Sequence, residues 1–168
     1  MIRYAAFACL ALAGCAPEAA PPVATAPEAA APAEPALVVQ PALAAGEIPA
    51  PAGEINVSSP AAGVRVTSPL VVEGTALNTW MFEGVLPVEL EVDGQVIAQG
   101  PAQQQAPDNW TNAGPVRFKA ELTFSVTEEK SAVLILREDM PRPVSADSDE
   151  PGPARTLRIP VTLVPAAQ

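Results

Sequence analysis

The sequence VRFKAELTFSV at residues 116–126 alternates between apolar and polar side chains, and this alternation decides the fold class. Successive side chains of a β-strand point to opposite faces of the sheet. The pattern therefore predicts a strand with one face on an apolar core and the other in water. Residues 86–92 alternate in the same way. Asp93-Gly94, a dipeptide typical of two-residue hairpin turns, follows them and leads into a second apolar stretch at 95–98.

Further short strands are expected on both sides of this centre. Residues 131–137 are almost entirely apolar, which predicts a central strand covered on both faces. No helical period of useful length appears between residues 54 and 164. The remaining predicted strands are 55–57, 64–66, 70–77 and 157–163. Seven or eight short strands separated by turns predict a two-sheet antiparallel β-sandwich, preceded by a disordered linker.

Composition and charge exclude several classes of function. The chain has 168 residues, 19 acidic and 9 basic side chains, a net charge of −10 and no histidine. Without a cluster of lysine and arginine, nucleic acid is not expected as a partner. Without histidine, no Ser-His-Asp or Cys-His catalytic unit and no imidazole metal ligand can form. We predict that the protein is not an enzyme and needs no cofactor.

Residues 1–14 have the features of a secretory signal: Arg3, a short apolar run and small residues before a cleavage site. The apolar run is shorter than the ~20 residues that span a bilayer. Leu12-Ala13-Gly14-Cys15 resembles the bacterial lipoprotein box, which implies that Cys15 is lipidated and becomes the first residue of the mature chain. Cys9 would leave with the signal, so no disulfide is expected.

Residues 15–53 are expected to hold the lipidated cysteine and a disordered tether. The 38 residues after Cys15 include nine prolines, fifteen alanines and no positive charge. Such a segment has too little bulky apolar surface to fold, and its prolines favour an extended spacer. By analogy with lipoprotein sorting, Ala16 favours the outer membrane. The protein is therefore expected in the cell envelope, lipid-anchored, facing the periplasm or the surface.

The folded domain is expected at residues 54–168, and its pattern of residues resembles a known family. The matching positions are Ile55-x-Val57-x-x-Pro60, Val66-x-Ser68-Pro69-x-x-Val72-x-Gly74-x-Ala76, Asn78, Phe82-Glu83-Gly84, Val92-x-Gly94, Gly114-Pro115-x-x-Phe118 and Ile159-Pro160-Val161. Residues 54–164 resemble the immunoglobulin-like domain of bacterial spore germination, which implies an immunoglobulin-like sandwich with an extracytoplasmic accessory role and no catalytic residues. The chain departs from the family by inserting Trp80-Met81 and by a longer acidic loop at 138–152.

Aromatic residues in loops are the candidate binding residues. Trp80, Met81 and Phe82 are adjacent, and Trp110 lies in a polar loop. Loop aromatics on a rigid sandwich offer a large contact area at a small cost in entropy. We expect Trp80 to be at least partly exposed. The alternative is that Phe82 and one tryptophan close the open ends of the sandwich.

Two groups of carboxylates have simpler explanations than chemistry. Glu89 and Glu91 share the polar face of one strand, where neighbouring arginines (Arg137, Arg155 or Arg158) are expected to pair with them. Glycoside hydrolysis by this pair would need a cleft and a raised pKa. Asp147, Asp149 and Glu150 are the residues that would bind calcium, but the EF-hand pattern is missing, and no metal is predicted.

The sequence thus favours a lipid-anchored envelope protein whose single domain is a non-catalytic binding or structural module. A protein partner is preferred because no sugar cleft is evident. Glycan binding through Trp80 and Trp110, to cell-wall or surface polysaccharide, is the alternative, and it requires the two rings to lie coplanar on one surface.

Overall fold

The computed structural model describes residues 41–166, whose regular structure is β-strand apart from one short 3₁₀ turn, η1. The predictions for the signal peptide, Cys15 and most of the tether lie outside the described residues. The elements are β1 (Glu47–Pro49), β2 (Ile55–Ser59), β3 (Arg65–Val66), β4 (Leu70–Leu77), η1 (Asn78–Trp80), β5 (Val85–Val92), β6 (Gln95–Gln104), β7 (Pro115–Leu122), β8 (Lys130–Arg137) and β9 (Ala154–Leu163).

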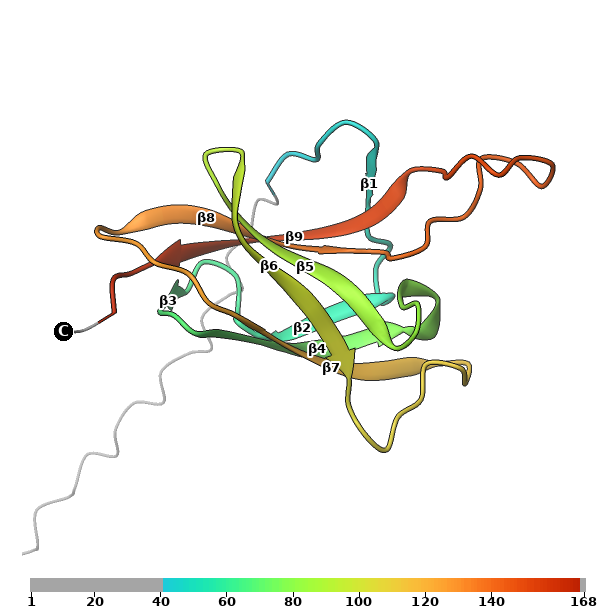
Figure 1. Ribbon diagram of the computed structural model, residues 1–168, viewed down its shortest axis with the longest axis horizontal. Coiled ribbons are helices and arrows are strands. Elements are labelled where there is room, and N and C mark those ends of the chain that lie inside the picture. The colour runs from blue at the N-terminus through green and yellow to red at the C-terminus, as the bar shows by residue number, and fades with distance from the viewer. Residues whose placement is uncertain (1–40, 167–168) are drawn as a thin grey trace, which may run out of the picture. The chain divides into compact units, whose positions relative to one another are not determined.

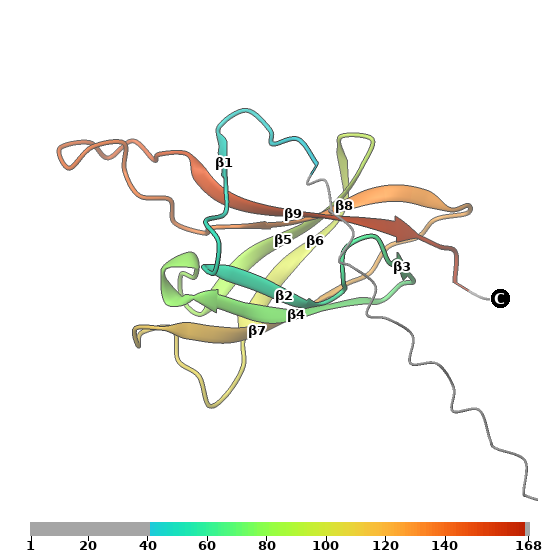
Figure 2. The same cartoon turned by 180° about the vertical axis from the view of Figure 1, so that it is seen from behind.

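The strands form one curled sheet that folds into two layers. Its hydrogen-bonded order is β1-β9-β8-β5-β6-β7-β4-β2, with β3 beside β9. Only β1 and β3 run parallel to β9; all other pairs are antiparallel. Figure 1 shows β8 and β9 in one layer and β2, β4 and β7 in the other, and Figure 2 shows the same layers from behind. The all-β, mostly antiparallel immunoglobulin-like fold is confirmed.

The core lies between the layers, where the predicted alternation places it. In β7 the residues Val116, Phe118, Ala120 and Leu122 are buried and the residues between them are exposed. Gly74 of β4 is paired with Phe118, and the Phe118 ring lies where a side chain at Gly74 would be. The strand β8 pairs with β5 and β9, and Leu134, Ile135 and Leu136 are fully buried, as expected for a central strand.

The β5–β6 hairpin contains an irregularity that matters for the surface. Asp93 and Gly94 both have positive φ, as a type I′ turn requires. The register then shifts by one residue, because Glu91 faces Val96 while Leu90 faces Ala98. This β-bulge moves every later residue of β6 by one position, so the strand partners beyond it differ from those that the turn alone predicts.

Two sequence-based boundaries are corrected. The folded domain begins earlier than Glu54, because Glu47–Pro49 pairs with Ala154–Thr156. These three residues carry no periodic signal, and their partner strand lies more than 100 positions away. The strand predicted to reach Val126 ends at Leu122, although Phe124 stays buried. With the short β1 and β3, the described part has nine strands. No helix between residues 41 and 166 is long and apolar enough to cross a membrane.

Candidate functional site

The Phe82-Glu83-Gly84 motif forms a tight turn at the start of β5. Glu83 and Gly84 both have positive φ, and Phe82 and Val85 exchange two backbone hydrogen bonds of 3.1 and 3.0 Å. This is the geometry of a type I′ turn. The positive φ of Gly84 favours glycine, and a β-carbon there would meet the Gln104 side chain at 2.9 Å, so the turn packs closely against Gln104. The turn leaves the Phe82 side chain 42% exposed.

Phe82 contacts Trp110 from the loop between β6 and β7. Their ring centroids are 6.1 Å apart with an interplanar angle of 62°, an edge-to-face pair. The backbone N–H of Trp110 donates to Gln104 Oε1 at 2.9 Å. Gln104 therefore holds the Trp110 loop and packs against the Gly84 turn, which brings two of the predicted binding residues together.

The expectation that Trp80 is partly exposed is wrong. Its side chain has 0% exposure and its Nε1 donates to Glu54 Oε2 at 3.0 Å. The Arg155 guanidinium lies 5.3 Å from the centroid of the Trp80 ring, a cation–π contact. Met81 is also buried. Both residues fill the end of the core, which is the position that the alternative interpretation gave to one tryptophan. The exposure of Trp80 was mispredicted because the partners of its indole lie far away in the sequence.

A partly buried ion-pair network stabilises this end of the domain. Arg155 pairs with Glu54 and, at 2.5 Å, with Glu138, which is almost fully buried. Hydrogen bonding to Glu138 and the charges of Glu138 and Glu54 raise the pKa of Arg155, against the opposing effect of burial. The network connects the chain before β2 with β9 and the chain after β8.

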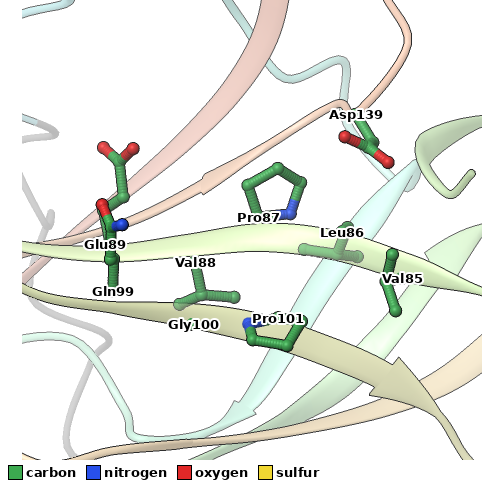
Figure 3. Close-up of a pocket in the computed structure, with 9 residues that line it drawn as sticks. All are labelled: Val85, Leu86, Pro87, Val88, Glu89, Gln99, Gly100, Pro101 and Asp139. Atoms are coloured by element: carbon green, nitrogen blue, oxygen red, sulfur yellow. The ribbon is translucent and has the colours of Figure 1, made fainter.

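A groove of about 550 Å³ runs along the outer surface of the β5–β6 hairpin. Its floor is mainly Val85, Pro87 and Pro101, and we call it the hairpin groove (Figure 3). Pro87 and Pro101 are direct cross-strand partners. With no N–H of its own, Pro87 cannot donate to β8, and the β5–β8 pairing stops at Val88.

Glu89 and Asp139 stand at opposite ends of the hairpin groove (Figure 3). Asp139 follows β8, and its backbone N–H donates to the Trp80 carbonyl at 3.1 Å. Burial, and then the negative charge of Glu83, raise the pKa of Asp139 above its ordinary value. Glu83 lies in the turn just before Val85, and Asp139 is bonded to the chain at Trp80, so both carboxylates belong to the Val85 end of the groove.

Residues 54–143 match the family model for the immunoglobulin-like domain of bacterial spore germination. The chain belongs to this family. The match confirms the predicted resemblance from β2 to just beyond β8; the closing Ile159-Pro160-Val161 lies outside the matched residues. No curated protein matches the chain.

On this spore-germination immunoglobulin-like domain, Glu89 and Glu91 have the arginine partners that were expected. Arg137 Nη1 lies 2.9 Å from Glu89 Oε2, and Arg158 Nη2 lies 3.0 Å from Glu91 Oε1. The same two arginines pair with Glu47 at 2.8 and 3.2 Å. The cluster covers the outer face of β8 and holds β1 in place, so these carboxylates have a structural explanation.

The calcium candidates lie in the loop between β8 and β9 of the spore-germination immunoglobulin-like domain. Within residues 41–166, no three carboxylate or thiol side chains gather as a metal ion would require, so Asp147, Asp149 and Glu150 form no such group. The loop closes on itself through backbone bonds between Val144 and Glu150 and between Gly152 and Arg142.

Sequence reasoning missed the groove of the spore-germination immunoglobulin-like domain. A two-residue turn at Asp93-Gly94 with regular register would put Pro87 opposite Gly100. Only the β-bulge brings it opposite Pro101. Pro87 within an alternating strand was the one available signal, because proline inside a strand indicates an interrupted ladder.

Proposed function

We propose that this protein is a lipid-anchored envelope lipoprotein whose immunoglobulin-like domain binds another protein and catalyses no reaction. The observation that carries the proposal is the hairpin groove, with its apolar floor and the exposed Phe82 beyond the Val85 end. Concave, mainly apolar surfaces with a few polar groups at the rim are typical of binding sites.

The floor of the groove is suited to binding because it is already rigid. Proline side chains lose almost no conformational entropy on burial, and Pro87 and Pro101 are held opposite each other by the hairpin. The nearby turn at Glu83-Gly84 is packed against Gln104, and the chain after β8 is fixed by Arg155. A preformed surface pays less of the ordering cost that weakens association.

The geometry favours a protein over a glycan. A sugar platform from Trp80 and Trp110 would need two exposed coplanar rings, and Trp80 is fully buried under Arg155. Phe82 is exposed and Trp110 is partly buried, and their rings meet edge to face at 62°, so the two rings do not form a shared coplanar stacking surface.

Membrane attachment is proposed through lipid on Cys15, which lies outside the described residues. The support is the sequence Leu12-Ala13-Gly14-Cys15 and the proline- and alanine-rich segment after it. Several acyl chains on one residue give stable anchoring. We place the protein in the outer membrane, facing the periplasm or the surface.

The non-catalytic role is supported by the state of the carboxylates. Glu89 and Glu91, the pair at the spacing used in glycoside hydrolysis, are each paired with an arginine. The chain contains no histidine to act as a general base at neutral pH.

Photo-crosslinking in living cells tests the proposal. A photoreactive residue replaces Gln99, an exposed position that lines the hairpin groove, and a matched one replaces Thr123, an exposed position after β7. We expect a discrete protein adduct from position 99 and none from position 123. The same adducts from both positions, or none from either, would contradict a protein-binding groove.

A further inference from the structure

The two ends of the hairpin groove differ in charge. The inference drawn from this difference rests on the proposed function, because it concerns the same groove. Glu89, at one end, is paired with Arg137. At the other end, Glu83 and Asp139 have no ion-pair partner among residues 41–166. One end of the groove is therefore neutralised and the other carries excess negative charge.

The domain has no spare cation to neutralise that end. Residues 41–166 contain eight lysine and arginine residues, and seven of them pair with other carboxylates. The eighth, Arg142, lines a separate hollow with Glu54 and Glu138. The Val85 end of the groove therefore keeps two carboxylates without a cation, and a cation from outside would neutralise them.

We propose that the hairpin groove binds a segment of a partner protein in which a lysine or arginine adjoins proline or apolar residues. The cationic group lies between Glu83 and Asp139, and the apolar residues cover Pro87 and Pro101. The exposed Glu83 and the half-buried Asp139 give such a contact orientation and specificity, while the apolar floor provides area.

Two other occupants fit less well. The chain's own segment at residues 16–40 contains three glutamates and no lysine or arginine, so it has the wrong charge for this end of the groove. A second copy of the chain carries the same net charge of −10, and long-range repulsion opposes its approach. Charge complementarity therefore selects a cationic partner.

Fluorescence anisotropy with defined peptides tests the inference on the protein purified from membranes in detergent. The probe is a dye-labelled hexapeptide of alternating proline and leucine with one central arginine. The control peptide has glutamate in place of that arginine. We expect measurable binding of the arginine peptide and at least about tenfold weaker binding of the glutamate peptide, since the control reverses a charge at the groove.

Variants of the protein locate the binding. Glu83→Gln combined with Asp139→Asn should weaken binding of the arginine peptide roughly three- to tenfold, the range expected for two surface ion pairs. The matched control, Asp147→Asn with Glu150→Gln, removes the same charges from the loop between β8 and β9 and should leave the affinity unchanged. Pro101→Arg should abolish binding by placing a cation in the groove. Melting curves show that each variant is folded.

The results separate this inference from the proposed function. Equal binding of the two peptides, no binding of either, or equal effects of the two double variants would overturn the inference. A protein adduct from position 99 would then still support a protein-binding groove. Selective peptide binding without an adduct in cells would support the inferred chemistry and overturn the proposed role in the envelope.

Discussion

Trp80 shows how a single side chain acquires its role from residues far away in the sequence. Its indole donates to Glu54, lies beneath Arg155 and shares the end of the core with Met81. A buried tryptophan needs a partner for its N–H, and Glu54 meets that need from 26 positions away. The exposed aromatic of this region is Phe82, two residues later.

Quenching of fluorescence should distinguish the two tryptophans. In Trp110→Phe the remaining Trp80 is fully buried, so its emission should resist iodide. In Trp80→Phe the remaining Trp110 is only partly buried and should be quenched. Loss of the hydrogen bond to Glu54 should also cost Trp80→Phe about 1–3 kcal/mol in unfolding free energy. Equal quenching of both variants would contradict the burial of Trp80.

The strand β7 shows what regular alternation achieves at the level of an element. Its four inward side chains reach the core from one strand, and eight consecutive residue pairs connect it with β4. Because the side-chain period is two, a shift of one residue would put Phe118 and Leu122 in water. The alternation therefore specifies both the buried face and the register.

Replacing a buried side chain of β7 with alanine should lower the stability of the domain. We expect Phe118→Ala or Leu122→Ala to lower the unfolding free energy by ~2–5 kcal/mol, through lost burial and the cavity left behind. Chemical denaturation measures the change, with Thr123→Ala at an exposed position as the control. A Phe118→Ala protein as stable as the control would rule out the assigned core.

The short strand β1 illustrates the opposite case, an element held by side chains rather than by its own pattern. The Glu47 carboxylate accepts from the Ala44 N–H and pairs with Arg137 and Arg158. Burial alone would raise the pKa of Glu47, but these hydrogen bonds and charges outweigh it and lower the pKa below its ordinary value of 4.5.

Stability should depend on pH through Glu47 in a defined direction. A carboxyl group whose pKa is lower in the folded state stabilises the fold above its ordinary value of 4.5. That stabilisation is lost as the pH falls through the folded-state pKa. We therefore expect Glu47→Gln to be less stable than the wild type at pH 7, with the difference shrinking toward pH 3. Denaturation at several pH values measures it, and a stability difference that stays constant between pH 7 and pH 3 would contradict this role of Glu47.

At the scale of the whole molecule, the hairpin groove combines several elements. The hairpin provides the floor and the chain after β8 provides Asp139, while Phe82 and Glu83 belong to the turn that leads into β5 next to the groove. The strand β6 pairs with β5 along its length and with β7 at only two positions, so it joins the two layers.

The anchor has its own test. Cys15→Ser should abolish incorporation of an alkyne-labelled fatty acid and move the protein from the membrane to the soluble fraction, because the thiol is the only proposed site of lipid attachment. Cys9→Ser should retain the label, since that residue lies within the predicted signal. Labelling of the Cys15→Ser protein would show that the anchor is elsewhere.

The sequence by itself determined the all-β class, most strands and the family, because alternation and turn dipeptides such as Asp93-Gly94 act over a few neighbouring residues. It also predicted that arginines would neutralise Glu89 and Glu91. Only the tertiary structure decided the surface: Trp80 is buried, β1 belongs to the domain, and Pro87 meets Pro101 across the hairpin. Each of these depends on a β-bulge or on side chains distant in the sequence, and local periodicity carries no information about either.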